Sequence, residues 1–414
     1  MTARNLLAPF RELTPSQRHA FTAAWAGWAL DAFDFFIFIF ALKAIAADFH
    51  TTVKAASEGI FLTLAMRPVG ALLFGWLAER YGRRPVLMVN VVSFSVFELA
   101  SAFAPDLRTL LFLRALFGFA MGGEWGVGAA LALESLPAKG RGLFSGILQE
   151  GYVVGYLLAS ALFAFAFPAL GWRGMFVVGA SPALLVLYIR QRVDESPAWR
   201  AGRQLKPPAA RETFAAIRAH LPAFLFMVAL MAFFNAFSHG SQDLYPTFLQ
   251  AQRGFSPQVT GTIAIIYNIG ALMGGIVFGS VSERLGRRRA IALAAVLAIP
   301  LIPLWAYATT PVLLAVGSFL MQFMVQGAWG IVPAHLNELS PPGARAILPG
   351  FAYQLGNLVM ARMGPFQAGF AEARGNDYSL ALALTVGIVA VLLAIVVLLG
   401  GERKSFELHA PQGA

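Results

Sequence analysis

The chain contains the same loop twice. Residues 75–84 read GWLAERYGRR and residues 279–288 read GSVSERLGRR, so the loops lie 204 positions apart in a chain of 414 residues. A second pair keeps the same offset, because residues 134–141 begin ESLP and residues 338–345 begin ELSP. Internal repetition constrains the architecture more than any other signal. It predicts two copies of one structural unit, each with the same basic loop between hydrophobic stretches.

The composition places these two units in a membrane. Hydrophobic residues make up 58% of the chain and charged residues 13%, with a mean hydropathy of +0.67. Apolar runs near ~20 residues dominate, which is the length that spans a bilayer. The net charge is +10, but the positive residues lie in short loops, where they report membrane orientation rather than nucleic-acid binding. The chain has no cysteine, which excludes disulfides, and no Walker-type phosphate loop, so nothing indicates ATP as the energy source.

Twelve apolar segments are predicted to form transmembrane helices. We predict an all-α membrane protein with two pseudo-symmetric six-helix bundles: an N-terminal bundle over 1–190, a cytoplasmic linker over 191–219, and a C-terminal bundle with a short tail over 220–414. The predicted spans are 19–41, 56–78, 85–104, 107–136, 142–167, 172–190, 220–249, 257–282, 289–307, 311–339, 344–373 and 377–400.

Lysine and arginine are divided unequally between the two sides of the predicted bundles. With the N-terminus inside, 22 of the 31 fall on the inner side and six on the outer side. Because positively charged loops stay in the cytoplasm, both termini and the linker are predicted to be cytoplasmic, in a multi-pass protein of the cell membrane. The first apolar run is too long for a signal-peptide core, which favours a retained first helix.

Polar residues inside the apolar spans are costly and are therefore functional candidates. The repeat offset pairs several of them across the two halves: Asp31 with Asn235, Asp34 with Ser238, and Gln149 with Tyr353. Matching polar positions in two apolar halves predict one central cavity. The seventh span is the most polar, since helical spacing puts five of its residues on one face. These are Asn235, Ser238, His239, Gln242 and Asp243.

Two arginines lie deep in the N-terminal half. Arg114 and Asp34 fall at similar depths in a core of about 30 Å, which predicts an ion pair that protonation of Asp34 would open. A permanent structural bridge is the alternative. Arg67 lies near the midplane, where its planar guanidinium suits bidentate binding of a carboxylate; snorkelling or pairing with another helix is the alternative. Glu98, Glu124 and Glu150 are candidates for protonated packing or gating residues.

The repeated loops suggest a cytoplasmic latch. Glycines at fixed positions permit close helix packing, and the acidic and basic side chains can bridge neighbouring helices. A purely topogenic basic loop is the simpler alternative. The predicted gating residues are Glu79, Arg80, Arg84, Glu283, Arg284 and Arg288.

At these loops the chain resembles the major facilitator superfamily, whose signature normally has Asp where this chain has Glu79 and Glu283. Residues 23–35 and 122–126 resemble the sialate:proton symporter family. Residues 235–247, with 326–341 and 353–358, are similar to the signature of lactate/pyruvate:proton permeases. That resemblance implies substrate recognition by the polar residues of the seventh span and by Arg67.

The sequence therefore predicts a proton-coupled symporter of small monocarboxylates such as lactate or pyruvate, working by rocking of two bundles. Uptake of sialic acid or another organic acid is the alternative, and a non-transporting membrane sensor is the alternative from a different class. No enzyme activity, cofactor, metal or nucleic-acid partner is expected, and the protein is expected to be a monomer in the lipid bilayer. The predicted substrate-binding residues are Arg67, Gln149, Asn235, His239, Gln242, Trp329, Tyr353, Gln354 and Asn357. The predicted proton-coupling residues are Asp31, Asp34, Arg114 and Asp243.

Overall fold

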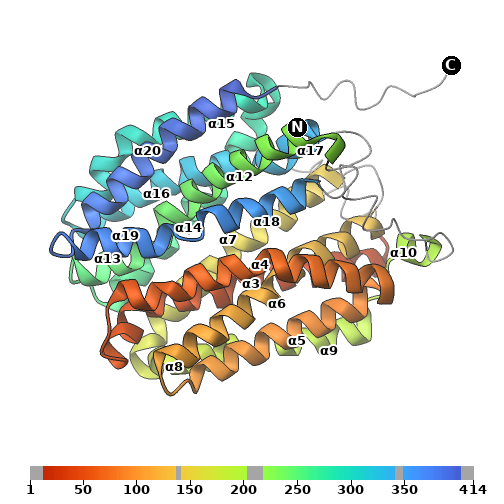
Figure 1. Ribbon diagram of the computed structural model, residues 1–414, viewed down its shortest axis with the longest axis horizontal. Coiled ribbons are helices and arrows are strands. Elements are labelled where there is room, and N and C mark those ends of the chain that lie inside the picture. Colours follow the sequence, from red (N-terminus) through yellow and green to blue (C-terminus); the bar gives the residue numbers. More distant parts are fainter. Residues whose placement is uncertain (1–12, 137–140, 203–217, 341–347, 402–414) are drawn as a thin grey trace. The chain divides into compact units, whose positions relative to one another are not determined.

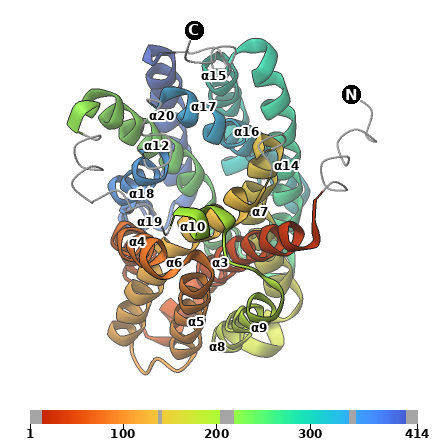
Figure 2. The ribbon, with the colours of Figure 1, turned by 90° about the vertical axis from the view of Figure 1, so that its right-hand side faces the viewer.

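The computed structural model describes residues 13–136, 141–202, 218–340 and 348–401, and these residues form helices and their connections (Figures 1 and 2). The helices are α3 (Pro15–Asp48), α4 (Val53–Tyr81), α5 (Arg83–Ala102), α6 (Leu107–Ser135), α7 (Arg141–Phe165), α8 (Phe167–Gly179), α9 (Ala183–Arg192), α10 (Pro197–Gly202), α12 (Leu221–Gln242), α13 (Tyr245–Ala251), α14 (Pro257–Leu285), α15 (Arg287–Ala298), α16 (Pro311–Trp329), α17 (Val332–Leu339), α18 (Leu348–Met360), α19 (Met363–Glu372) and α20 (Tyr378–Leu399), with a 3-10 turn at Ile299–Leu301 and a π turn at Pro303–Tyr307.

The predicted all-α architecture is confirmed. Each predicted span coincides with one helix or with a run of short helices, and within the described ranges nine helical segments are long and apolar enough to cross a membrane. The first helix begins at Pro15, earlier than predicted, because Thr14 and Gln17 form a capping box that satisfies the first backbone N–H groups. Residues 203–217 of the predicted linker and the ends of the second repeated segments, including Arg345, lie outside the described residues.

Prolines interrupt several of the predicted spans. The predicted span 220–249 is divided into α12 and α13, because Pro246 has no N–H to bond back to the turn before it. The prediction that Asp243 continues the helical face of the seventh span is therefore wrong, since Asp243 lies in the bend after α12. Pro182 precedes α9 and Pro333 lies at the start of α17 in the same way.

The packing of the helices divides the chain into two compact units. The first comprises Met1–Pro207, Asp243–Ile265 and Ala361–Tyr378; the second comprises Pro208–Gln242, Ile266–Met360 and Ser379–Ala414. Helices α13 and α19 therefore pack with the first unit, against α3 and α4. Two interactions fasten them there: Nζ of Lys43 donates to the carbonyl of Gln250 at 2.8 Å, and Arg362 pairs with Glu58 at 2.9 Å.

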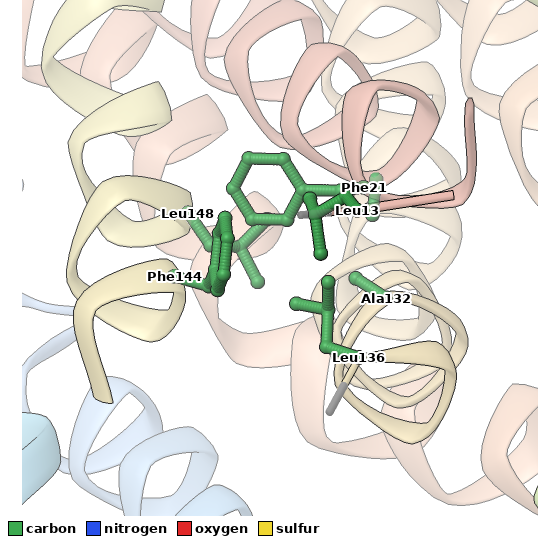
Figure 3. Close-up of a cluster of buried hydrophobic side chains, with 7 residues drawn as sticks. Leu13, Phe21, Ala132, Leu136, Phe144 and Leu148 are labelled. Carbon is green, nitrogen blue, oxygen red and sulfur yellow. The ribbon is translucent and has the colours of Figure 1, made fainter. Parts of the chain in front are cut away.

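Helix α3 is the most enclosed element of the first unit, with α4, α6, α7, α8 and α9 packed around it. Near its start, apolar side chains of α3, α6 and α7 meet in a buried cluster (Figure 3). The labelled members are Leu13, Phe21, Ala132, Leu136, Phe144 and Leu148. This cluster joins the start of α3 to α6 and α7, two helices that follow it at a distance in the sequence.

The repeat in the sequence is also a repeat of helix packing. In both units a glycine lets two helices approach so closely that a Cβ atom would collide with the facing residue. The pairs are Gly70 with Phe119 and Gly123 with Phe74 in the first unit, and Gly274 with Phe323 and Gly327 with Phe278 in the second. Every member lies 204 positions from its counterpart, so α4 and α6 pack as α14 and α16 do.

Candidate functional site

Arg67 lies inside the first unit, where α3, α4 and α6 meet. It is 1% exposed, and its guanidinium carbon lies 5.9 Å from the ring centroid of Trp28. Its positive charge acts on two carboxyl groups, Asp31 of α3 and Glu124 of α6. Both carboxyl groups are fully buried, and none of their four oxygen atoms makes a hydrogen bond to a described residue. The buried arginine expected from the sequence is present, and Glu124, which the repeat offset could not single out, lies beside it.

The ring of Trp28, beside this arginine, packs against aromatic side chains of α6 and α7. The ring of Trp28 lies 6.5 Å from that of Trp125 and 5.6 Å from that of Tyr152. Gln149, one of the predicted substrate-binding residues, is half-buried on α7 three residues before Tyr152. Flat, partly polar rings of this kind can hold a small organic molecule against a charged group.

The second buried arginine of the first unit has a different partner from the one predicted. Nη2 of Arg114 lies 2.5 Å from Oε2 of Glu98 and 2.8 Å from Oγ of Ser101. The predicted ion pair with Asp34 is wrong, because among the described residues neither oxygen of Asp34 has a hydrogen-bond partner. Three aromatic rings also lie near the Arg114 guanidinium, those of Phe38, Phe117 and Phe176, and Phe117 is the nearest of them at 4.4 Å.

Asp34 is nevertheless close to this pair. Its carboxyl group interacts electrostatically with Glu98 and Arg114. A Cβ atom on Gly179 would lie 3.0 Å from Cγ of Glu98 and 3.2 Å from Oδ1 of Asp34, so the two carboxyl groups flank the same point of α8. Two carboxyl groups and one guanidinium thus share one buried site.

The polar face of α12 lies in the second unit. Asn235, Ser238, His239 and Gln242 are all buried there. Nε2 of Gln242 donates to Oγ of Ser238 at 2.6 Å, whereas neither amide atom of Asn235 makes a hydrogen bond within the described part of the chain. An amide buried with unsatisfied donor and acceptor groups is rare in a folded protein. Asn235 can therefore bind a ligand without first giving up a protein partner.

Trp329 of α16 connects this face to α18. Its Nε1 donates to the carbonyl of Phe234 at 3.3 Å, and its ring lies 5.9 Å from that of Tyr353 in an edge-to-face arrangement. Further along α18, Nδ2 of Asn357 donates to Oε1 of Gln354 at 3.4 Å. The predicted substrate-binding residues are thus divided between the units: Arg67 and Gln149 belong to the first, and the others to the second.

The repeated loops form ion pairs in both units, but through arginines that the sequence prediction omitted. In the first unit Arg83 pairs with Glu79 at 2.7 Å and with Glu134 at 3.1 Å. In the second unit Arg287 pairs with Glu338 at 3.3 Å. Arg83 and Arg287 are repeat counterparts, and so are Glu134 and Glu338.

A signal for this latch was present in the sequence. The arginine and the glutamate are 51 positions apart in each half, so the two repeated motifs could have been paired with each other. The other expected gating residues lie nearby with different partners. Arg80 stacks on Trp76 and Tyr81, Nη2 of Arg84 donates to the carbonyl of Arg190, and Nε of Arg288 donates to that of Val397. Glu283 and Arg284 are exposed.

The first unit carries an additional support at its loop. Oε1 of Glu195 accepts the backbone N–H of Arg83 at 2.9 Å, and Nε1 of Trp199 donates to the carbonyl of Glu79 at 2.8 Å. A carboxylate at the start of α5 is favourable because helix N-termini carry partial positive charge. Over the described ranges, His, Asp and Glu side chains form no group of three that could hold a metal ion.

Comparison with known proteins assigns the fold to a family. The family model of the Major Facilitator Superfamily matches residues 24–256 and 228–412. The chain is 28% identical to a carboxylic acid transporter protein homolog of Saccharomyces cerevisiae, covering 98% of this chain and 72% of the relative. It is 31% identical to a probable 4-methylmuconolactone transporter of Cupriavidus pinatubonensis, covering 86% and 84%. It is 29% identical to the sialic acid transporter NanX of Escherichia coli, covering 94% and 95%.

Solved structures support the same fold. The xylose transporter XylE from E. coli, in a partially occluded inward-open conformation, superposes with a TM-score of 0.75. That comparison covers 95% of this chain and 99% of the other at 18% sequence identity. At this level of identity the likeness concerns the arrangement of helices alone.

Proposed function

Since the chain belongs to the major facilitator superfamily and is a multi-pass membrane transporter rather than an enzyme, we propose that it carries small monocarboxylates such as lactate and pyruvate together with a proton. The observation that carries the proposal is Arg67, a fully buried guanidinium inside the first unit. A buried cation with a planar donor fork suits a carboxylate ligand. The names of the relatives point the same way, because they include a carboxylic acid transporter homolog and a sialic acid transporter.

In this proposal Arg67 binds the substrate carboxylate, and the aromatic rings next to it enclose the rest of the molecule. Gln149 supplies a polar group from α7. An anion in an apolar interior needs a countercharge, because desolvation penalises an isolated charge heavily.

Selectivity is assigned to the second unit. Asn235, His239 and Gln242 offer hydrogen-bonding groups on one face of α12, and Trp329 and Tyr353 pack beside it. Gln354 and Asn357 contribute from α18. A site that bonds a hydroxyl or keto group rejects analogues lacking that group more strongly than an apolar pocket does. The face should therefore favour 2-hydroxy and 2-keto acids over plain acids.

Proton coupling is assigned to the site around Arg114. Glu98 and Asp34 share one arginine, so one of the two carboxyl groups can hold a proton while the other pairs with the guanidinium. Asp31 and Asp243 are further proposed coupling residues. Loss or gain of that proton changes the charge of a fully buried site. Such a change can shift the equilibrium between two conformations of the protein.

Transport is proposed to use two moving bundles. Alternating access is proposed to involve rocking of two bundles, 1–190 and 220–414, with 191–219 as the linker. Both termini are assigned to the cytoplasm by the excess of positive residues on that side. The ion pairs of Arg83 and Arg287 would latch the inner side, and the protein is proposed to act as a monomer in the cell membrane.

A competition panel on purified, reconstituted protein tests the function. Uptake of labelled lactate into proteoliposomes is measured with and without an inward proton gradient, in the presence of unlabelled pyruvate, propionate or sialic acid. We expect accumulation only with the gradient, strong competition by pyruvate, weaker competition by propionate and little by sialic acid. Equal lactate uptake with and without the gradient would contradict proton coupling. Absence of lactate uptake would contradict the proposed substrate class.

A larger organic acid is the second candidate substrate. The relative at 31% identity is named a probable 4-methylmuconolactone transporter, and another relative is a cis,cis-muconate transport protein. Muconate and sialic acid both carry carboxylates that Arg67 could bind. Muconate is therefore added to the competition panel. If muconate or sialic acid competes better than pyruvate, this second candidate replaces the first.

A further inference from the structure

We propose that Asp31 and Glu124 together hold one proton beside Arg67, and that a carboxylate substrate binds Arg67 only when this proton is present. The inference rests on the proposed function, in which Arg67 receives the substrate carboxylate. It adds Glu124 as a residue that controls access to that arginine. The two acids also form a proton site separate from the one around Arg114.

The geometry brings the two carboxyl groups to one face of α3. A Cβ atom on Gly27 would overlap Oε1 of Glu124, so this oxygen lies directly against Gly27. Gly27 and Asp31 are four residues apart and therefore lie one turn apart on the same face of the helix, about 6 Å along its axis. A Cβ atom on Gly128 would lie 3.2 Å from the same oxygen of Glu124. Two glycines thus make room for the carboxyl group of Glu124 near Asp31.

The charges of this site do not balance when every group is ionised. The groups that act on Glu124 are Asp31 and Arg67, and Arg67 also acts on Asp31. Asp34, on the next turn of α3, interacts with Asp31 as a further acid. Two carboxylates and one guanidinium leave one negative charge in a fully buried place where no carboxyl oxygen accepts a hydrogen bond from a described residue. Such a charge is strongly disfavoured, and binding a proton removes it.

The second unit shows that the fold does not need these groups. At the repeat offset, Asp31 corresponds to Asn235, Arg67 to Ala271 and Glu124 to Ala328. The helices that carry Arg67 and Glu124, α4 and α6, pack through the same glycine and phenylalanine pairs as α14 and α16. Neutral residues therefore suffice for helix packing at these positions. The acids of the first unit have a role that the second unit does not share.

The proton makes the arginine available to substrate. With both acids ionised, the guanidinium offsets protein carboxylates, and an incoming anion would add a further negative charge to a buried site. With one proton bound to Asp31 or Glu124, a substrate carboxylate can take the interaction with Arg67 without a net increase in negative charge. The proton comes from the aqueous side with the substrate, and it forms an O–H bond on one of the two carboxyl groups.

Calorimetry of lactate binding counts the protons taken up per lactate bound. It is run in two buffers with different ionisation enthalpies, at a pH high enough for the ligand-free protein to have lost the proton from this pair. Glu124→Gln removes the acid and keeps its shape, and Glu124→Ala introduces the residue type that the second unit has at this position. Each variant should take up about one proton fewer per lactate than the wild type, with an affinity that depends less on pH. The matched control is Asp106→Asn, a change at an exposed acid before α6, which should keep the wild-type proton count.

Infrared spectroscopy gives a second readout that needs no ligand. A protonated-carboxyl band at neutral pH should be present in the wild type and in Asp106→Asn, and weaker in Glu124→Gln. An unchanged band together with an unchanged proton count in the Glu124 variants overturns the inference. If the wild type binds neither lactate nor pyruvate, the proposed function fails, and the infrared difference alone then decides whether Asp31 and Glu124 hold a proton.

Discussion

Asp34 and Glu98 should substitute for each other as partners of Arg114. Each single change, Asp34→Asn or Glu98→Gln, leaves one carboxylate to balance the arginine. The double variant leaves none. Because Arg114 is 1% exposed, its charge would then be buried without an anion, and the double variant should lose far more stability than the two single variants together.

The expected losses of stability can be estimated from the contacts of Asp34, Glu98 and Arg114. Glu98→Gln keeps an acceptor 2.5 Å from Nη2 of Arg114, so it should cost about 1 kcal/mol, the contribution of one hydrogen bond. Asp34→Asn should cost no more, since neither oxygen of Asp34 makes a hydrogen bond to the part of the chain that the structure describes. Leaving one charge of a buried pair uncompensated costs about 3–5 kcal/mol. The coupling energy between the two changes should therefore be about 1–3 kcal/mol.

The measurement is the free energy of unfolding of purified protein in mixed detergent micelles, as a double-mutant cycle. Asp34→Asn combined with Glu150→Gln is the matched control, and these changes should be additive, because Glu150 is not among the groups that act on Asp34. Adding Arg114→Met to the double variant should restore stability, since no charge is then left. A double variant whose loss equals the sum of the single losses within about 0.5 kcal/mol refutes the shared site.

Helix packing, the substrate arginine and the tryptophan of α16 can each be tested by single changes. Gly70→Ala and Gly274→Ala should each destabilise the protein by about 1–3 kcal/mol, because the added methyl group meets the facing helix backbone; Gly75→Ala, with open space around it among the described residues, should be neutral or stabilising in the same thermal-unfolding assay. Arg67→Lys should weaken lactate binding about tenfold or more, because the charge stays but the planar fork is lost; calorimetry giving wild-type affinity would exclude Arg67 from the site. Trp329→Phe removes the donor to the carbonyl of Phe234, and it should cost about 1 kcal/mol of stability while raising the lactate concentration needed for half-maximal uptake; unchanged uptake would separate Trp329 from substrate binding.

The membrane class, the repeat and the helical spans could all be predicted from the amino-acid sequence. Apolar segments long enough to cross a bilayer have little choice of structure, because backbone groups in lipid must be satisfied within the segment. The two similar loops lie 204 residues apart in the sequence. In the structure, the glycines that permit close helix packing are related by the same offset. The buried position of Arg67 was also predictable, because it lies in the middle of such a segment.

Only the tertiary structure shows which charged side chains contact each other. Similar depth in the membrane favoured Asp34 as the partner of Arg114, but depth says nothing about which face of a neighbouring helix is presented, and Glu98 of α5 makes the pair. The same applies to Glu124, whose carboxyl group reaches the space left by Gly27. In an apolar interior a single rotation of a helix exchanges one partner for another, so the pairing depends on side-chain packing among several helices.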